Sequence, residues 1–272
     1  MSYASLMVHV ELDDFADGRL AIARTLAARF DARVIGIAAQ AEPLPVYYNE
    51  GFTTDSLLLQ TRVEIEKSLE QAGERFRDAM KGRLGQIEWR AALRDPVPYI
   101  AEQCRAADLL IVGTGSRTDP IARLDVGDLL LQAGRPLLLV PPGVSSLEAA
   151  RIFIAWKDTL EARRAIASAL PLLRGSQHVV VVGIDEFADP ATASRGVEDV
   201  VTWLACHGVK TTGKVVPLKG EIAKDLETLA DEEGADLFVA GAYGHGRFRE
   251  WVFGGVTRDV LTQTSRCRLL VH

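Results

Sequence analysis

The stretch that decides the fold reads ADLFVAGAYGHGRFREWVFGGVTRDVL, residues 235–261. Its apolar run 237–240 predicts a buried strand, because a short run without alternation suits a parallel sheet covered on both faces. Glycines follow this strand, and a second pair of glycines opens a helix predicted at 256–264. Glycine lets backbone N–H groups approach an oxyanion, and a helix start adds unpaired donors. The stretch therefore predicts a phosphate site.

Cationic side chains in the loop between the glycine clusters favour the same interpretation. Arg247 and Arg249 add positive charge, and His245 is either a further phosphate contact or a solvated loop residue. A turn without a ligand is the alternative, because glycine-rich turns often follow strands.

Four blocks of sequence occur twice in the same order, which predicts two copies of one fold. LAIARTL at Leu20 pairs with RAIASAL at Arg164, and VIGI pairs with VVGI further along the chain. ADLLIVG at Ala107 pairs with ADLFVAG at Ala235, and QAGRPLLLV pairs with QTSRCRLLV at the end of each copy. The first copy has the longer connection between its second strand and ADLLIVG.

Strands alternate with helices in both copies, which predicts α/β units with parallel sheets. Strands are predicted at 6–11, 33–39, 87–93, 108–112, 136–140, 152–156, 178–184, 210–216, 237–240 and in the terminal RLLVH. Helices are predicted at 16–30, from about 55 to 82, and at 97–105, 160–173, 193–207 and 221–233. The stretch AEPLPVYYNEGFTTDS is expected to be irregular. Pro141-Pro142-Gly143 predicts a boundary between domains at 1–142 and 151–272.

Bulk properties exclude several classes of protein. A net charge of −6 argues against a general nucleic-acid binder. No apolar run approaches the about 20 residues of a membrane helix, and the first residues lack the basic leader of a signal peptide. Cys104, Cys206 and Cys267 lie far apart, without metal-type spacing, and are interpreted as buried thiols. We therefore expect a cytoplasmic protein with no nucleic-acid or membrane partner.

Acidic residues near the first strand suggest a metal site only weakly. Asp13, Asp14 and Asp17 precede or open a predicted helix, where carboxylates usually act as N-terminal caps. We expect no metal ligands among them.

The spacing Gly241-x-x-Gly244, nine residues, then Gly254-Gly255-Val256-Thr257 resembles the nucleotide loop of the universal stress protein family. The resemblance covers nearly the whole chain, as two linked copies of that family's domain. It implies two Rossmann-like domains, each a five-stranded parallel sheet with helices on both faces, joined through their final strands as a pseudo-two-fold pair. It also implies ATP or a related adenine nucleotide, with or without Mg²⁺, at the carboxyl ends of the first, second and fourth strands.

The resemblance assigns a set of positions in the second copy to the nucleotide. They are Ala155, Trp156, Lys157, Asp158, Gly183, Ile184, Gly241, Tyr243, Gly244, His245, Arg247, Gly254, Gly255, Val256 and Thr257. No residue is assigned a catalytic role.

Two positions depart from the family's pattern. Lys157 stands where the family usually has an aspartate, and its ammonium group can only donate hydrogen bonds. It could instead pair with a phosphate, or Asp158, one residue along, could take over from the aspartate. Gly255 replaces a hydroxyl residue, and Thr257 lies two residues further on. Trp156 is interpreted as a core residue, with stacking on a base as the alternative.

The first copy lacks the same glycines. Ser116 stands opposite Gly244, and Arg123 and Leu124 stand opposite the second glycine pair. We therefore expect a degenerate loop in the first copy and a nucleotide in the second copy alone.

The expected function is that of a nucleotide-binding regulatory or stress-response protein. Enzymatic turnover has little support, because no Gly-Lys-Ser or Gly-Lys-Thr follows the glycines and no dinucleotide fingerprint follows the first strand. A non-nucleotide scaffold, a module for another small molecule and a weak ATPase stay open as alternatives. A homodimer also stays open.

Overall fold

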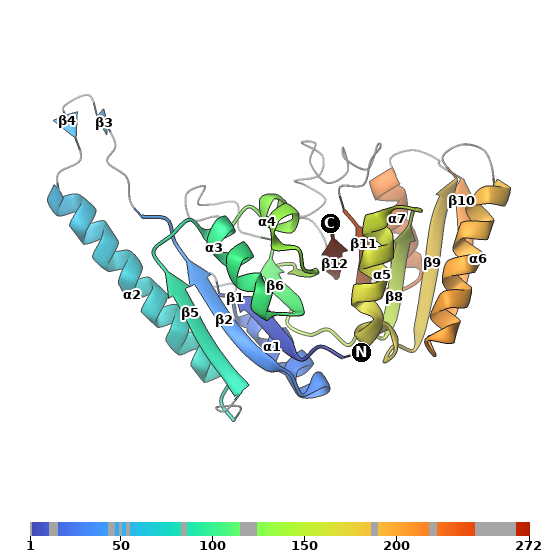
Figure 1. The fold of residues 1–272 in the computed structure, drawn as a ribbon, viewed down its shortest axis with the longest axis horizontal. Coiled ribbons are helices and arrows are strands. Elements are labelled where there is room, and N and C mark those ends of the chain that lie inside the picture. Colours follow the sequence, from blue (N-terminus) through green and yellow to red (C-terminus); the bar gives the residue numbers. More distant parts are fainter. Residues whose placement is uncertain are drawn as a thin grey trace.

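The computed structural model describes residues 2–10, 16–42, 47–48, 51–52, 55–82, 86–114, 124–185, 190–217, 222–242 and 265–272. In the amino-terminal half the strands of the main sheet are β1 (Ser5–His9), β2 (Arg33–Ala39), β5 (Ile87–Ala92), β6 (Leu109–Gly113) and β7 (Leu137–Val140). In the carboxyl-terminal half they are β8 (Arg151–Trp156), β9 (His178–Asp185), β10 (Thr211–Pro217), β11 (Leu237–Gly241) and β12 (Cys267–Val271). These strands form one ten-stranded sheet (Figure 1).

The sheet has the order β10-β9-β8-β11-β12-β7-β6-β1-β2-β5. Within each half the strands are parallel, and the order from the outer edge is third, second, first, fourth, fifth. The two halves meet where β12 pairs antiparallel with β7, with Leu269 opposite Leu138. The predicted fold class, two parallel α/β units related by a pseudo-two-fold axis, is confirmed.

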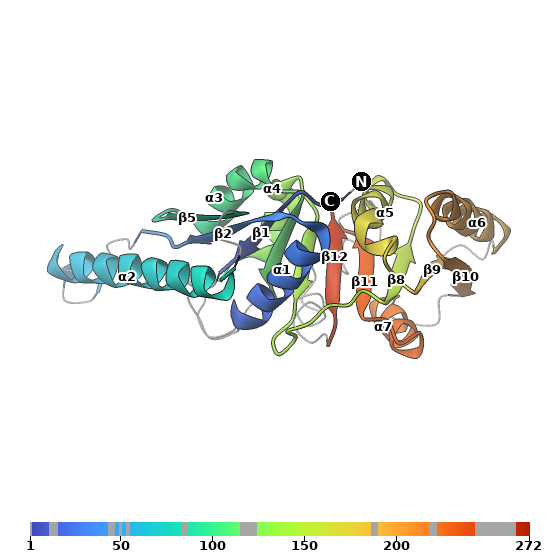
Figure 2. The same cartoon turned by 90° about the horizontal axis from the view of Figure 1, so that it is seen from below.

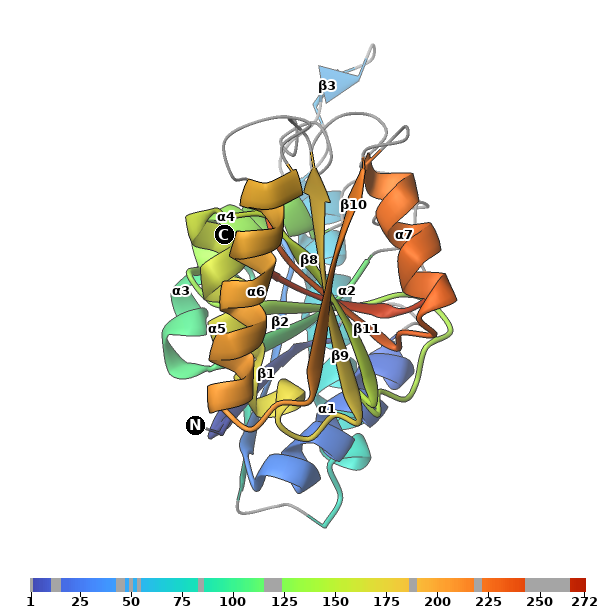
Figure 3. The same cartoon turned by 90° about the vertical axis from the view of Figure 1, so that its right-hand side faces the viewer.

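Seven α-helices cover the two faces of this sheet. They are α1 (Ala16–Phe30), α2 (Asp55–Ala79), α3 (Pro96–Gln103), α4 (Val126–Ala133), α5 (Leu160–Leu173), α6 (Pro190–Cys206) and α7 (Ile222–Glu232), counted over the described residues. One core cluster joins α1, α2, α5 and α6 to the sheet, and a second cluster on the opposite face joins α3, α4 and α7. In Figure 2, α3 and α4 lie diagonally opposite α7. Figure 3 shows α6 and α7 on opposite faces of β9 and β10.

The strands at the centre of the sheet are buried on both faces, and apart from Arg268 of β12 they are apolar. Every residue of β6, β7 and β12 is buried. Continuous apolar runs of this kind are typical of parallel strands between two helical layers. Helix ends follow local signals as well. Asp125 caps α4 by accepting from the backbone N–H of Gly127 at 2.9 Å, and Gly134 ends the helix with a left-handed φ of 57°.

The longer connection in the first copy contains a small hairpin and the helix α2, which has 25 residues where its counterpart α6 has 17. The hairpin pairs β3 (Tyr47–Tyr48) with β4 (Gly51–Phe52), inside the stretch that was expected to be irregular. Figure 1 shows the start of α2 extending beyond the sheet, with the hairpin beside it. The other end of α2 packs on β2 and β5. There the rings of Phe76 and Trp89 stack, with 5.7 Å between their centroids.

The prediction of three buried thiols is wrong for one of them. Cys104 and Cys267 are buried, and burial raises the pKa of each to about 12. Cys206 is exposed at the last residue of α6. Val200 and Leu204 define the buried side of that helix, and Cys206 lies away from it.

Within the described ranges, no helix is both long enough and apolar enough to cross a membrane. Among the same residues, no group of His, Cys, Asp and Glu side chains is placed to hold a metal ion.

Candidate functional site

The predicted site residues that the structure describes lie at the carboxyl ends of three neighbouring strands. Trp156 at the end of β8 is in register with Gly183 of β9, and Ala155 is in register with Ala240 of β11. β8 and β11 are adjacent although they are the first and fourth strands of their half. The chain therefore leaves neighbouring strands in different directions here, which is where α/β sheets commonly form a ligand crevice.

Gly241 brings the end of β11 against the first turn of α5. A Cβ atom at this position would lie 2.3 Å from the backbone nitrogen of Ala162 and 2.6 Å from the carbonyl carbon of Glu161. No larger residue fits there without a backbone shift. Thr159 caps the same turn, because its hydroxyl accepts from the N–H of Ala162 at 3.3 Å. The segment that follows β11 thus begins beside a helix start.

The connection from β8 to α5 contains Lys157 and Asp158, the two charged residues predicted for the site. Asp158 accepts hydrogen bonds from Arg163, at 3.0 Å from Nε and 2.5 Å from Nη2. Lys157 is half-buried, and its backbone carbonyl accepts from the N–H of Thr159 at 2.7 Å. The carboxylate expected to replace the family's aspartate is therefore already engaged with a guanidinium group, although it retains capacity for further donors.

Gly183 has a packing role in β9. A Cβ atom there would lie 2.8 Å from Cγ2 of Val197, so the glycine lets α6 approach the sheet closely. Ile184 is paired with Val216 of β10. The backbone of Ile184 therefore lies at the carboxyl-terminal edge of the strands, where the nucleotide is predicted to bind.

The loop that carries the two glycine clusters lies outside the described residues. This applies to the predicted positions Tyr243, Gly244, His245, Arg247, Gly254, Gly255, Val256 and Thr257. The segment that leads into the loop is placed: the N–H of Ala242 donates to the carbonyl of Val271 at 2.8 Å. The imidazole Nδ1 of His272 lies 3.3 Å from the carbonyl oxygen of Ala242, and Arg164 donates to the carbonyl of His272 at 3.4 Å. Sequence analysis missed these last two contacts, since they join segments far apart in the chain.

The corresponding edge of the amino-terminal half is built differently. His9, which matches Ala155 in register, is buried, and its carbonyl accepts from Nε of Arg19 at 3.2 Å. Burial, and then the charge of Arg19, lower the pKa of His9 to about 3. Arg19 is itself buried, whereas the matching Arg163 is mostly exposed. The two halves therefore share a backbone but not the chemistry at the end of their first strand.

Comparisons with known proteins agree with this architecture. No family model matches the chain. A universal stress protein of Synechocystis is 25% identical over 169 residues, which are 58% of this chain and 55% of that protein, so the match spans little more than half of the relative. A universal stress protein structure from Archaeoglobus fulgidus covers 98% of this chain and 95% of its own, with a TM-score of 0.71 and 14% identity. The chain has the fold of a tandem universal stress protein.

A second solved structure, a Pseudomonas aeruginosa protein assigned to the universal stress proteins, covers 99% of this chain and 93% of its own. Its TM-score is 0.59 and its identity is 16%. The resemblance to the universal stress protein family that the glycine spacing predicts is thus confirmed.

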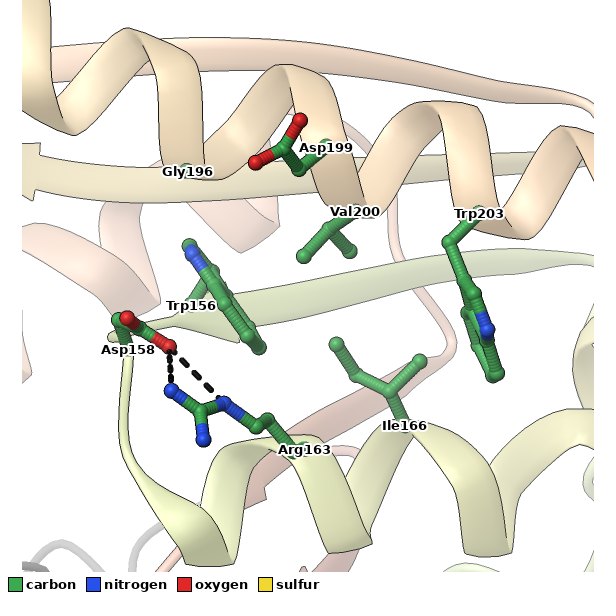
Figure 4. Close-up of a pocket in the computed structure, with 8 residues that line it drawn as sticks. All are labelled: Trp156, Asp158, Arg163, Ile166, Gly196, Asp199, Val200 and Trp203. Atoms are coloured by element: carbon green, nitrogen blue, oxygen red, sulfur yellow. Dashed lines mark hydrogen bonds and ion pairs between the residues drawn. The ribbon is translucent and has the colours of Figure 1, made fainter.

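A cleft of about 560 Å³ lies beside this edge of the universal stress protein fold, between α5 and α6 (Figure 4). It is lined by Trp156, Asp158, Arg163, Ile166, Gly196, Asp199, Val200 and Trp203. Among these residues, Trp156 and Asp158 were predicted from the sequence. The signal that could have pointed to the cleft is Trp203, a large aromatic residue in α6 that is 40% exposed.

Proposed function

We propose that the chain binds an adenine nucleotide at the carboxyl ends of β8, β9 and β11 and acts as a regulatory or stress-response protein. The observation that carries the proposal is the position of Gly241. It sets the entry of the glycine-rich loop against the first turn of α5, at the point where β8 and β11 diverge. Helix starts and glycine turns at such points supply backbone donors to phosphates.

The chemistry of the described residues suits the phosphate part of a nucleotide. Lys157 offers an ammonium group at the end of β8, and ammonium groups bind phosphates as point charges. Lys157 cannot accept a hydrogen bond from a ribose hydroxyl or an adenine amino group, so that role falls to Asp158 or to backbone carbonyls. We assign the ligand to the unit 151–272, with 1–142 as its partner domain.

A regulatory role is favoured over turnover because the glycines are not followed by the lysine and hydroxyl residue of a P-loop. Weak ATP hydrolysis is the alternative, and phosphate release measured on the same samples distinguishes it.

Isothermal titration calorimetry with ATP and Mg²⁺ tests the proposal. We expect Gly244→Asp and Gly254→Asp to abolish the heat of binding, because a carboxylate among the N–H donors repels phosphate. Ser116→Asp is the matched control, since Ser116 stands opposite Gly244 in the first copy. It should leave binding unchanged. Equal heats from the wild type and all three variants would refute the nucleotide site.

A second titration measures which nucleobase the site prefers. A universal stress protein that is 20% identical to this chain has been solved in complex with cAMP. Its TM-score of 0.35 means that it suggests a probe and nothing more. Titrating cAMP beside ATP, and GTP as a control, measures whether the site prefers adenine and a long phosphate chain.

A non-nucleotide scaffold is the second candidate, and Lys157 and Gly255 favour it because each removes a group that the family uses. Mass spectrometry of gently purified protein separates the two. Co-purified ATP or AMP supports the nucleotide site, and a different ligand supports the scaffold.

A further inference from the structure

The cleft between α5 and α6 is a formed groove with distinct ends. At one end the ion pair of Asp158 with Arg163 lies beside Trp156. At the other end Trp203 packs edge-on against His207, with 4.3 Å between the ring centroids. Figure 4 shows both indole rings projecting into the space between the helices. Beyond that far end the two helices are joined where Arg174, after α5, donates to the carbonyl of His207 at 3.3 Å.

The floor of the cleft is apolar. Ile166 of α5 and Val200 of α6 lie between the two tryptophans, and they are 3% and 8% exposed. Gly196 lies against the indole of Trp156, where a Cβ atom would be in ordinary contact, 3.5 Å from Nε1. A volume of about 560 Å³ falls within the range of roughly 300–1,000 Å³ typical of small-molecule sites.

The charge at the rim is negative. Arg163 neutralises Asp158, which leaves Asp199 as the carboxylate on the α6 side. Within the described part of the chain, no basic side chain forms an ion pair with Asp199. Indole faces attract cations through their quadrupole, and tryptophan does so most strongly among the aromatic residues. Two indoles and one uncompensated carboxylate therefore favour a positive ligand.

In the amino-terminal half an ion pair joins the two matching helices. There Arg75 of α2 donates to Asp17 of α1 at 2.7 Å, so an ion pair bridges the two helices. Phe76 and Trp89 fill the space under α2, and a Cβ atom at Gly36 would lie 2.7 Å and 2.8 Å from their rings. In the carboxyl-terminal half, smaller valines at the matching faces bring α6 down onto β9 and β10, and the cleft opens beside it.

We propose that this cleft binds a small organic cation with an apolar body, such as an aromatic amine, beside the nucleotide loop. The cleft shares Trp156 and Asp158, at one end, with the positions assigned to the nucleotide, whereas Ile166, Asp199, Val200 and Trp203 belong to the cleft alone. The apolar part lies on Ile166 and Val200 between the indoles, and the ammonium group faces Asp199. The proposal does not depend on nucleotide binding.

Three probes with the same ring and different charges test the proposal by calorimetry: 2-phenylethylamine, 2-phenylethanol and phenylacetate. We expect the amine to bind about tenfold more tightly than the alcohol, because an exposed carboxylate and the indole faces together favour the cation by roughly that factor. Phenylacetate should bind most weakly. The amine should still bind when ATP is present at saturating concentration.

Variants assign the selectivity to named residues. Asp199→Asn should weaken the amine about threefold and leave the alcohol unchanged, whereas Glu198→Gln, the adjacent exposed carboxylate outside the cleft, should change neither. Trp203→Ala should weaken both ligands, and the amine more than the alcohol, because it removes apolar contact area and one indole face, with an unchanged circular dichroism spectrum. Equal affinity for all three probes, or an unchanged amine-to-alcohol ratio in Asp199→Asn, would overturn the proposal. Competition by ATP would place the amine in the nucleotide site instead and would also overturn it.

Discussion

His9 shows how one buried side chain sets a response of the whole protein to acid. Its imidazole lies at the end of β1 and is 4% exposed, and the buried guanidinium group of Arg19 lies nearby. These surroundings lower the pKa of His9 to about 3, while an unfolded chain keeps a histidine pKa of about 6.5. Between these values the unfolded state binds a proton that the native state does not. The free energy of unfolding therefore falls as the pH drops through this window.

Replacing His9 with alanine, the residue at the matching position of β8, should remove this acid sensitivity. From pH 7 to pH 5 the wild type should lose about 2 kcal/mol of stability through His9 alone, and the variant should lose that much less. Urea unfolding at both pH values measures the difference. His207→Ala, at the partly exposed end of α6, controls for the loss of an imidazole. An equal loss in the wild type and His9→Ala would contradict the assignment.

At the scale of elements, a buried charge network joins β12 to α7. Arg268 of β12 is 2% exposed, and its Nη2 donates to Glu227 of α7 at 2.8 Å. Arg266 bonds Asp231 one turn further along α7 and also approaches Glu227. Burial is the main reason that the pKa of Arg268 falls to about 10. A central strand thus carries a cation whose principal partner is one carboxylate.

Glu227→Leu should cost about 3 kcal/mol of stability, because it leaves the Arg268 guanidinium buried without its carboxylate. Adding Arg268→Leu should recover most of that loss. In the first copy of the repeat, β7 has Leu137 at the position that corresponds to Arg268, so a leucine is compatible with this strand. Urea unfolding of both single variants and the double variant completes a thermodynamic cycle. Additive losses would show that the pair does not interact.

The same element shows what sequence alone can and cannot predict. Buried strands such as β6 and β11 were predicted within a residue or so, because apolar runs and the internal repeat both marked them. From its charge alone, Arg268 would be expected at the surface. The register of β12 instead places it beside Phe238. The cleft between α5 and α6 was not predicted either: Trp203 marks one end of it, but its shape depends on how closely two separate helices approach. The glycine loop was predicted from its spacing, and it stays a prediction.

At the scale of the whole molecule, the two halves share their cores. Both hydrophobic clusters contain residues from each half. Polar contacts cross as well: the hydroxyl of Tyr3 donates to the carbonyl of Ser168 at 2.7 Å, and Arg29 donates to the carbonyl of Glu148 at 3.0 Å. Removing one half would expose the β7–β12 seam and part of each cluster.

We therefore expect the chain to unfold as one cooperative unit. Variants that keep only Trp89, in the amino-terminal half, or only Trp203, in the carboxyl-terminal half, report on each half by fluorescence. Their urea midpoints should coincide with each other and with the midpoint from circular dichroism, because shared burial links the two transitions. Two separate midpoints would show that the halves unfold independently.

The antiparallel seam also decides where the sheet stops. Because β7 and β12 cover each other, β5 and β10 are the outer strands of the main sheet within the described residues, and both carry charged residues. Glu88 of β5 accepts from Arg90 at 2.7 Å, and Lys214 of β10 donates to Glu233 at 2.7 Å. Fixed charges along an outer strand discourage another chain from adding to it. The apolar strands that would most readily recruit a neighbour are enclosed in the middle, so lateral growth into fibres is opposed at both borders.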